Sequence, residues 1–251
     1  MGKVREALAA GRPSYGSWVT LDSAMAAEVM GRAGFDWLIL DGQHGAVDAG
    51  NMLSLIQAAE LGGTPAIVRV GWNDESQIMR ALDLGAYGVI VPMVSTAQDA
   101  QRAAAASHYP PHGIRSFGKV RSYYGPSGAG APEPLCLVMI ETAEALQNLE
   151  AIAATPGVDG LFVGPIDLAI SLGQGPAMPM TPEVLDAVRE VIAVCRKHGK
   201  ISGSATLGAD NARALVEMGL TFVPLGADAG FVRRGAAAEL AAAQGWANQG
   251  G

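Results

Sequence analysis

Residues 135–141 read Leu-Cys-Leu-Val-Met-Ile-Glu, six apolar residues in succession that end in an acid. Such a run, without polar alternation, is typical of a strand buried on both faces in a parallel sheet. The triplet Val-Ile-Val at residues 89–91 has the same character. The chain has eight short β-rich runs, of which residues 135–141 are one. The other seven lie at residues 14–20, 35–41, 65–70, 88–94, 160–164, 200–205 and 221–226.

Helical patterns occupy the segments between these runs. Ala-rich stretches occur near residues 23–33 and 97–106, and Thr181-Pro182-Glu183 places a cap-type residue and a first-turn Pro at the start of a helix that extends to about His198. Eight strands that alternate with helices predict a (β/α)8 TIM barrel, which commonly needs about 250 residues in one domain. We therefore expect residues 1–251 to form a single barrel domain, with a frayed tail at residues 247–251.

Composition excludes several classes of function. The 251 residues carry a net charge of −7, and basic residues are scattered, so we expect no nucleic-acid partner and no membrane association. The two cysteines, Cys136 and Cys195, cannot build a disulfide framework or a thiolate zinc cluster, and the start of the chain lacks the apolar core of a signal peptide. Small-molecule chemistry in the cytoplasm is the expectation that remains.

Polar residues end four of the predicted strands, at the rim where barrel enzymes carry their chemistry. Glu141 ends one strand, and Asp167 follows the neighbouring strand after a Gly-Pro-Ile turn. Two carboxylates from adjacent strands can share a hard cation such as Mg²⁺ or Mn²⁺ and leave coordination positions for substrate. A helix cap or a salt bridge is the competing interpretation of both acids.

The other two strand ends supply a base and a cation. His44 stands three residues after Asp41, close enough for the acid to orient the imidazole of a general base, although a lone histidine is more often structural. Arg69 can stabilise oxygen charge through fixed donors, or it can pair with a neighbouring acid. The backbone N–H groups of Ile166 and Asp167 are candidates for binding a substrate carboxylate.

The positions of the lysines argue against a Schiff-base mechanism. Such a mechanism needs a desolvated lysine at a strand end, whereas the four lysines of this chain lie elsewhere, at Lys3, Lys119, Lys197 and Lys200. Motifs of acyl-enzyme, nucleotide-binding and zinc-protease sites are absent from the sequence. Residues 109–134, rich in Gly, Pro, Ser and Tyr, form a long connection that either makes a plain excursion or folds in part towards a neighbouring active site.

Taken together, these motifs resemble the HpcH/HpaI family of class II pyruvate aldolases over nearly the whole chain. The resemblance rests on residues 35–37, 41–44, 68–70, 91–94, 109–115, 140–142 and 164–168. It implies a divalent metal, Mg²⁺ or Mn²⁺ with Co²⁺ as a further candidate, bound by Glu141 and Asp167. It also implies that Arg69 contacts the keto oxygen and that His44 with Asp41 forms the acid/base unit.

The resemblance further implies a homo-oligomer, typically a hexamer built as a trimer of dimers that exchange their last helix. Residues 235–243 could form that helix, and Asp83 is implied to reach the acid/base unit of an adjacent subunit. Relatives often carry Glu at the position of Gln43 and Gln at the position of Met139, so we expect activity with altered substrate preference. The residues expected to contact substrate are Gln43, Arg69, Gly164, Pro165, Ile166 and Asp167.

The expected reaction is enolisation of pyruvate or a related 2-keto acid such as hydroxypyruvate, followed by attack on an aldehyde to give a 4-hydroxy-2-oxo acid. Oxaloacetate decarboxylation is an expected side activity because it gives the same enolate. Three alternatives stay open: a CoA-ester lyase of the same superfamily, a sugar-phosphate enzyme using Gly203-Ser204 and Gly226-Ala227, and a non-catalytic keto-acid binding protein.

Overall fold

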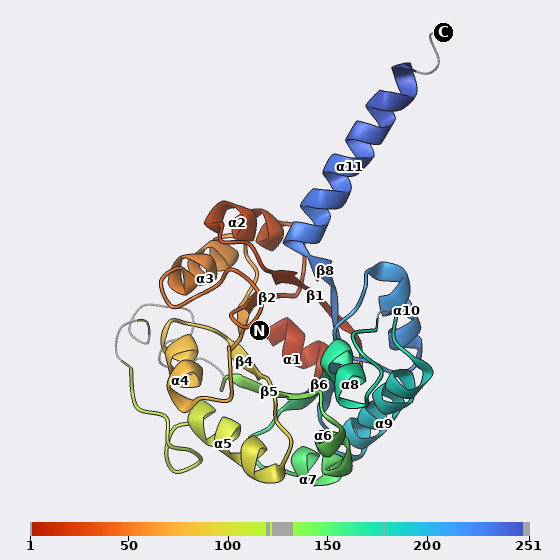
Figure 1. Cartoon of the computed structure of the whole chain (residues 1–251). Helices are drawn as coiled ribbons and strands as arrows, with labels where there is room; N and C mark the ends of the chain where they lie inside the picture. Colours follow the sequence, from red (N-terminus) through yellow and green to blue (C-terminus); the bar gives the residue numbers. More distant parts are fainter. Residues whose placement is uncertain (1, 119–120, 122–132, 178, 248–251) are drawn as a thin grey trace.

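The fold is a closed barrel of parallel strands, described by a computed structural model over residues 2–118, 121, 133–177 and 179–247 (Figure 1). Each strand pairs with the next along the chain, and the last pairs back with the first. The predicted (β/α)8 barrel is therefore confirmed. The strands are β1 Ser14–Val19, β2 Trp37–Asp41, β3 Ala66–Arg69, β4 Gly88–Val91, β5 Leu135–Ile140, β6 Gly160–Val163, β7 Ile201–Ser204 and β8 Phe222–Ala227.

Helices surround the barrel and close one of its ends. Thr181 caps α9 through its hydroxyl, which accepts the Val184 N–H at 3.3 Å as the sequence predicts. The amino-terminal helix α1 crosses the barrel opening, where Val4 packs against the interior core (Figure 1). The helices are α1 Gly2–Ala9, α2 Ala24–Arg32, α3 Met52–Leu61, α4 Glu75–Asp83, α5 Ala97–Ser107, α6 Ala143–Gln147, α7 Leu149–Ala153, α8 Pro165–Ser171, α9 Pro182–His198, α10 Ala209–Glu217 and α11 Asp228–Ala247.

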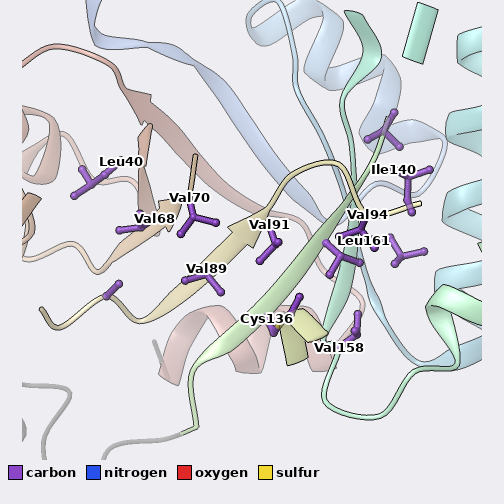
Figure 2. Packing of buried hydrophobic residues seen from close by; sticks show 14 of the residues in the cluster. Leu40, Val68, Val70, Val89, Val91, Val94, Cys136, Ile140, Val158 and Leu161 are labelled. Atoms are coloured by element: carbon purple, nitrogen blue, oxygen red, sulfur yellow. The ribbon is translucent and has the colours of Figure 1, made fainter. Parts of the chain in front are cut away.

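Two apolar layers hold the barrel together because side chains alternate along each strand. In β2, Trp37 and Ile39 belong to the interior cluster, whereas Leu38 and Leu40 pack between the sheet and the helices. Figure 2 shows part of this outer layer around Val68, Val89 and Val91. Inside, Trp37 stacks on Phe222 with ring centroids 3.7 Å apart. Among the described residues, both layers consist of buried apolar side chains.

The fourth strand ends earlier than predicted. The sequence suggested a strand over residues 88–94, but β4 ends at Val91. Pro92 lacks a backbone N–H for the sheet, and Met93 adopts a left-handed φ of 56°, which is incompatible with a continuing strand. This break turns the backbone of Met93 towards the neighbouring strand end, where it contributes to the candidate site.

The last helix, α11, projects away from the barrel (Figure 1). Its base is anchored by the buried Asp228, whose carboxylate accepts hydrogen bonds from the Thr20 N–H at 2.9 Å, the Thr20 hydroxyl at 2.7 Å and the Leu21 N–H at 3.1 Å. Ala247 is the last residue of α11, and the rest of the predicted frayed tail, residues 248–251, lies outside the described residues. None of the helices in the described ranges combines the length and apolarity needed to cross a membrane.

Candidate active site

The centre of the candidate site is an ion pair between the ends of β2 and β3. Asp41 and Arg69 are partners in the sheet register, so their side chains meet across adjacent strands. The Arg69 Nε donates to Asp41 Oδ1 at 2.9 Å and a terminal nitrogen donates to Oδ2 at 2.7 Å, a bidentate pair. Trp18 of β1 lies against the same guanidinium, whose Cζ is 4.6 Å from the indole ring centroid. Arg69 is therefore held in one orientation before substrate arrives.

The Asp41 carboxylate also fixes the turn that follows β2. Its Oδ1 accepts the backbone N–H groups of Gln43 at 3.1 Å and His44 at 3.2 Å. Burial raises the pKa of Asp41, but the hydrogen bond and charge of Arg69 and the N–H donors of His44 and Gln43 together hold it below its usual value. Asp41 is thus a charged structural acceptor in this chain.

The hydrogen bond that the structure shows between Asp41 and His44 uses the backbone N–H of His44 and not its ring. The His44 side chain is exposed, and within the described part of the chain its ring makes no hydrogen bond to Asp41. The physical reason is competition, because both Asp41 oxygens face the stronger bidentate donor Arg69. Gln43 lies beside them, and its Oε1 is buried without a hydrogen-bond partner among the described residues.

Glu141, directly after β5, is a buried carboxylate with one unused oxygen. Its residue is only 1% exposed, and Oε1 accepts the Met93 N–H at 2.6 Å. Oε2 has no hydrogen-bond partner among the described residues. Burial raises the pKa of Glu141 to about 7, with the Met93 N–H lowering it, the charge of Asp167 raising it and the charge of Arg69 lowering it. A buried anionic oxygen without a partner needs a cation or a proton.

Met93 supplies the one hydrogen bond to Glu141 from a strained backbone. A left-handed conformation in a non-glycine residue costs on the order of 1–3 kcal/mol and persists only where its surroundings enforce it. Here it turns the Met93 N–H from the end of β4 onto Glu141 Oε1. The sequence interpretation did not identify this residue, since a left-handed methionine has no sequence signature; Trp18 was missed for a related reason, because an aromatic residue in a strand looks like core.

Asp167 is the second predicted metal ligand, and it lies in the first turn of α8. Gly164 is the N-cap residue and Pro165 is the first residue of the helix, so the first helical N–H groups are those of Ile166 and Asp167. Asp167 is exposed, and its charge acts on the Glu141 carboxyl, which places the two acids at the same rim. In the part of the chain that the structure describes, no group of three or more His, Cys, Asp or Glu forms a metal cluster.

These residues fit a divalent cation held by two carboxylates. Glu141 Oε2 is a buried oxygen without a hydrogen-bond partner among the described residues. Asp167 is a second acid, and its charge raises the pKa of Glu141. Gly164 forms a cradle beside this oxygen, since a Cβ at that position would overlap Oε2 and lie 3.0 Å from the Glu141 Cβ. Carboxylate oxygens are the preferred ligands of Mg²⁺ and similar hard ions. The chemistry of the donor set therefore agrees with the sequence prediction.

Gly164→Ala tests this cradle. We expect the added methyl group to displace the Glu141 carboxylate and to weaken Mn²⁺ binding by at least about tenfold, since overpacking typically costs 1–3 kcal/mol. Titration of Mn²⁺ followed by electron paramagnetic resonance measures this directly. Gly50→Ala, in an exposed loop, is the control. Unchanged Mn²⁺ affinity in a folded Gly164→Ala protein would argue against a metal at Glu141.

Asp83 lies away from the other predicted catalytic residues. It ends α4, which runs back from the carboxyl end of β3 to the amino-terminal end of β4. Arg115 donates to Asp83 Oδ1 at 2.9 Å, and Arg115 in turn lies over the Tyr109 ring at 4.6 Å. Thus residues 109–118 of the long connection contact α4 of the same chain through Arg115. Residues 119–120 and 122–132 lie outside the described residues.

Comparisons with known proteins show which sequences this chain resembles. The sequence model of the family described as HpcH/HpaI aldolase/citrate lyase matches residues 14–234. The chain is 41% identical to a 5-keto-4-deoxy-D-glucarate aldolase of Klebsiella pneumoniae subsp. pneumoniae over 92% of each chain. It is 40% identical to a 4-hydroxy-2-oxo-heptane-1,7-dioate aldolase of the same organism over 93% of this chain and 91% of the other.

The fold comparison gives the same relationship. A crystal structure of a HpcH/HpaI aldolase/citrate lyase family protein from Burkholderia cenocepacia superposes with a TM-score of 0.87 at 32% identity. The match covers 97% of this chain and all of that one, so the similarity extends over the whole barrel rather than over a shared strand motif.

Proposed function

This chain belongs to the HpcH/HpaI aldolase/citrate lyase family, and from that premise we propose that it is a class II aldolase, a carbon–carbon lyase that reversibly adds pyruvate or a related 2-keto acid such as hydroxypyruvate to an aldehyde. The products would be 4-hydroxy-2-oxo acids, and oxaloacetate decarboxylation is an expected side activity. The observation that carries the proposal is the buried Glu141 carboxylate. Its Oε2 has no partner in the described residues, and the charge of Asp167 raises its pKa.

Glu141 and Asp167 are the residues that would hold the cation, Mg²⁺ or Mn²⁺ with Co²⁺ as a further candidate. When bound, a divalent cation supplies Lewis acidity that neutralises charge developing on the keto acid. The protein would position its ligands in advance, because the Met93 N–H binds one oxygen of Glu141 and leaves the other, a buried oxygen, without a partner among the described residues. The backbone N–H groups of Ile166 and Asp167, at the start of α8, would orient the substrate carboxylate.

Arg69 would stabilise the charge on the keto oxygen. Two of the five guanidinium donors bind Asp41, and Trp18 lies against its plane, so the remaining N–H groups have a fixed direction. A preorganised donor of this kind costs little reorganisation when charge develops in the transition state. Asp41 is therefore the residue that positions Arg69, in addition to its expected connection with His44.

His44 is the proposed base that removes a proton from the donor methyl group, directly or through water. Its exposed ring stands at the same rim, on the turn that Asp41 fixes through the His44 N–H. The same ring would return a proton to the aldehyde oxygen after carbon–carbon bond formation. Gln43, the residue before His44, would contact the substrate; its buried Oε1 has no partner within the described residues.

We also propose a cytoplasmic homo-oligomer, a hexamer built as a trimer of dimers, in which Asp83 acts on a neighbouring subunit. In support, Asp83 lies at the far end of α4, away from its own Arg69, and Arg115 holds it in place. The projecting α11 exposes Leu240, and an apolar groove of about 540 Å³ between α2 and α11 exposes Val29 and Val232. Exchange of α11 between subunits would cover these surfaces.

Removal of residues 235–251 tests the assembly. We expect the shortened chain to lose the hexamer, measured by light scattering, because it lacks the projecting end of α11 and Leu240, the exposed apolar residue that would pack on a partner. Aldol activity should fall with it if Asp83 acts between subunits. A full-length chain that is monomeric at micromolar concentration would contradict both parts of this proposal.

The reaction is tested by deuterium incorporation into the methyl group of pyruvate in D2O. We expect exchange that needs Mg²⁺ or Mn²⁺, stops with chelator, is lost in Glu141→Ala and is impaired in His44→Ala, since enolisation requires both charge neutralisation and a base. The protein variants must be shown to be folded by circular dichroism. Absence of exchange in the folded, metal-loaded wild-type protein would overturn the aldolase proposal.

A further inference from the structure

A second cavity opens at the amino-terminal end of the barrel, opposite the rim that carries Glu141 and Arg69. Its volume is about 610 Å³, within the usual range of small-molecule sites. It lies between α1, the end of α9 and the starts of β5 to β8. Its polar lining residues are Arg5, Asp159, Arg196, Lys200, Ser202 and Thr221.

The cavity collects three cations although the chain as a whole carries a charge of −7. Arg5 donates from a terminal nitrogen to the Glu133 carbonyl, and its Nε is buried without a partner among the described residues. Lys200 donates to the Val158 carbonyl at 2.6 Å. Carbonyl oxygens carry no formal charge, so these hydrogen bonds do not neutralise the positive charges of Arg5 and Lys200.

Arg196 is the third cation, and nothing within the described ranges pairs with it. Its neighbours on α9 behave differently: Arg189 binds Asp186, and Lys197 binds Glu150 at 2.8 Å. The Arg196 guanidinium instead lies over Gly219 at the cavity wall, where a Cβ would approach its terminal nitrogen to 2.8 Å.

The single acid of the cavity wall compensates these charges poorly. Asp159 already accepts the Cys136 N–H at 2.8 Å. Burial raises the pKa of Asp159, although the Cys136 N–H and the charges of Arg5, His108 and Lys200 lower it. None of the three cavity cations lies within ion-pair distance of Asp159 in the described structure. Counting formal charges, three cations and one acid leave the wall at +2.

We propose that this cavity is a binding site for a phosphomonoester of a small metabolite. A phosphate group is close to a dianion at neutral pH and matches the wall charge, and guanidinium groups bind its oxygens through several donors at once. Ser202 and Thr221 also line the cavity, and their hydroxyls lie 3.4 Å apart, so they make this part of the wall polar. The cavity is larger than an inorganic ion needs. Because it opens at the opposite end of the barrel, such a ligand binds alongside pyruvate rather than in competition with it.

The test is calorimetric titration of the metal-loaded protein, saturated with pyruvate, with glycerol 3-phosphate, inorganic phosphate and succinate at constant ionic strength. We expect one glycerol 3-phosphate per chain, bound more tightly than inorganic phosphate or succinate. Arg196→Gln should weaken this binding by about tenfold or more, since hydrogen bonds to charged groups contribute about 1.5–3 kcal/mol. Arg189→Gln, the same change on an outward position of α9, should bind like the wild type.

Several results would overturn the proposal. If the wild-type protein bound no glycerol 3-phosphate, the site would not exist. If Arg196→Gln and Arg189→Gln weakened glycerol 3-phosphate binding equally, the ligand would be attracted by the overall charge of α9 rather than bound in the cavity. Binding that disappears when pyruvate and metal are saturating belongs to the active site. Preference for inorganic phosphate or succinate would exclude a phosphomonoester. Arg196 is exposed, so its substitution should leave folding intact, which a thermal melt verifies.

Discussion

Glu141→Gln is expected to abolish metal-dependent proton exchange from pyruvate, with a loss of about 10³-fold or more, because an amide cannot replace a buried carboxylate as a ligand for a hard cation. The substitution keeps the shape of the side chain and its acceptor for the Met93 N–H. Mg²⁺ should raise the melting temperature of the wild type but not that of Glu141→Gln, which gives a readout independent of activity.

The same variant should show an opposite effect on the stability of the metal-free protein. Burial raises the pKa of Glu141 from 4.5 to about 7 in the folded state, so the folded protein binds this proton more tightly than the unfolded chain. The wild type therefore loses stability as the pH rises from about 4.5 through 7, by roughly 3 kcal/mol at most for a shift of this size. Glu141→Gln lacks this loss.

Urea denaturation of chelator-treated proteins between pH 5 and 8 measures the difference. As the pH rises, the free energy of unfolding of Glu141→Gln should increase relative to that of the wild type. Glu144 is an exposed acid three residues away, and Glu144→Gln should follow the wild type. If the free energy of unfolding changed with pH in the same way for all three proteins, the pKa of Glu141 would not be raised by its burial.

Arg69→Lys is expected to lower the rate constant of proton exchange by about 10²–10³-fold while Mn²⁺ binding persists. Lysine keeps the charge that Asp41 needs but cannot hold both Asp41 oxygens and present further fixed donors to the keto oxygen. The planar contact with Trp18 is also lost. Arg69→Ala is a poorer test, since it leaves Asp41 buried and unpaired, at a cost of about 3–5 kcal/mol in folding.

Exchange rates at saturating pyruvate, measured by nuclear magnetic resonance, separate the catalytic effect from weaker binding. Arg102→Lys, an exposed arginine on α5 paired with Asp99, is the control and should exchange at the wild-type rate. If Arg69→Lys exchanged as fast as this control, Arg69 would be a structural partner of Asp41 and no more.

The sequence predicted the barrel and its rim because both follow from local patterns. A run such as residues 135–141 is buried on both faces wherever it lies, and parallel strands bring their carboxyl ends to one rim. Hence Arg69, Glu141 and the turn that carries Asp167 were placed correctly at strand ends. The residues named for metal binding and for catalysis stay predictions, but the positions on which they rest are those of the structure.

The details of the site depended on contacts between residues far apart in the chain. The role of Asp41 in orienting His44 stays a prediction, and closure of the sheet adds a partner that the sequence did not identify, because Arg69 donates to both Asp41 oxygens. The hydrogen bond from Met93 to Glu141 requires β4 to break beside β5, and Trp18 reaches Arg69 only because the strands close into a barrel.

The sequence by itself therefore determined the order of strands and helices, the family and the edge at which chemistry is expected. Hydrophobic periodicity is a local property, and parallel pairing converts it into a common rim. Only the tertiary structure decided which partner each buried charge takes and where uncompensated cations gather, as at Arg5 and Arg196 below the barrel. The reason is that electrostatic interactions depend on distance and burial in space, which separation along the chain does not specify.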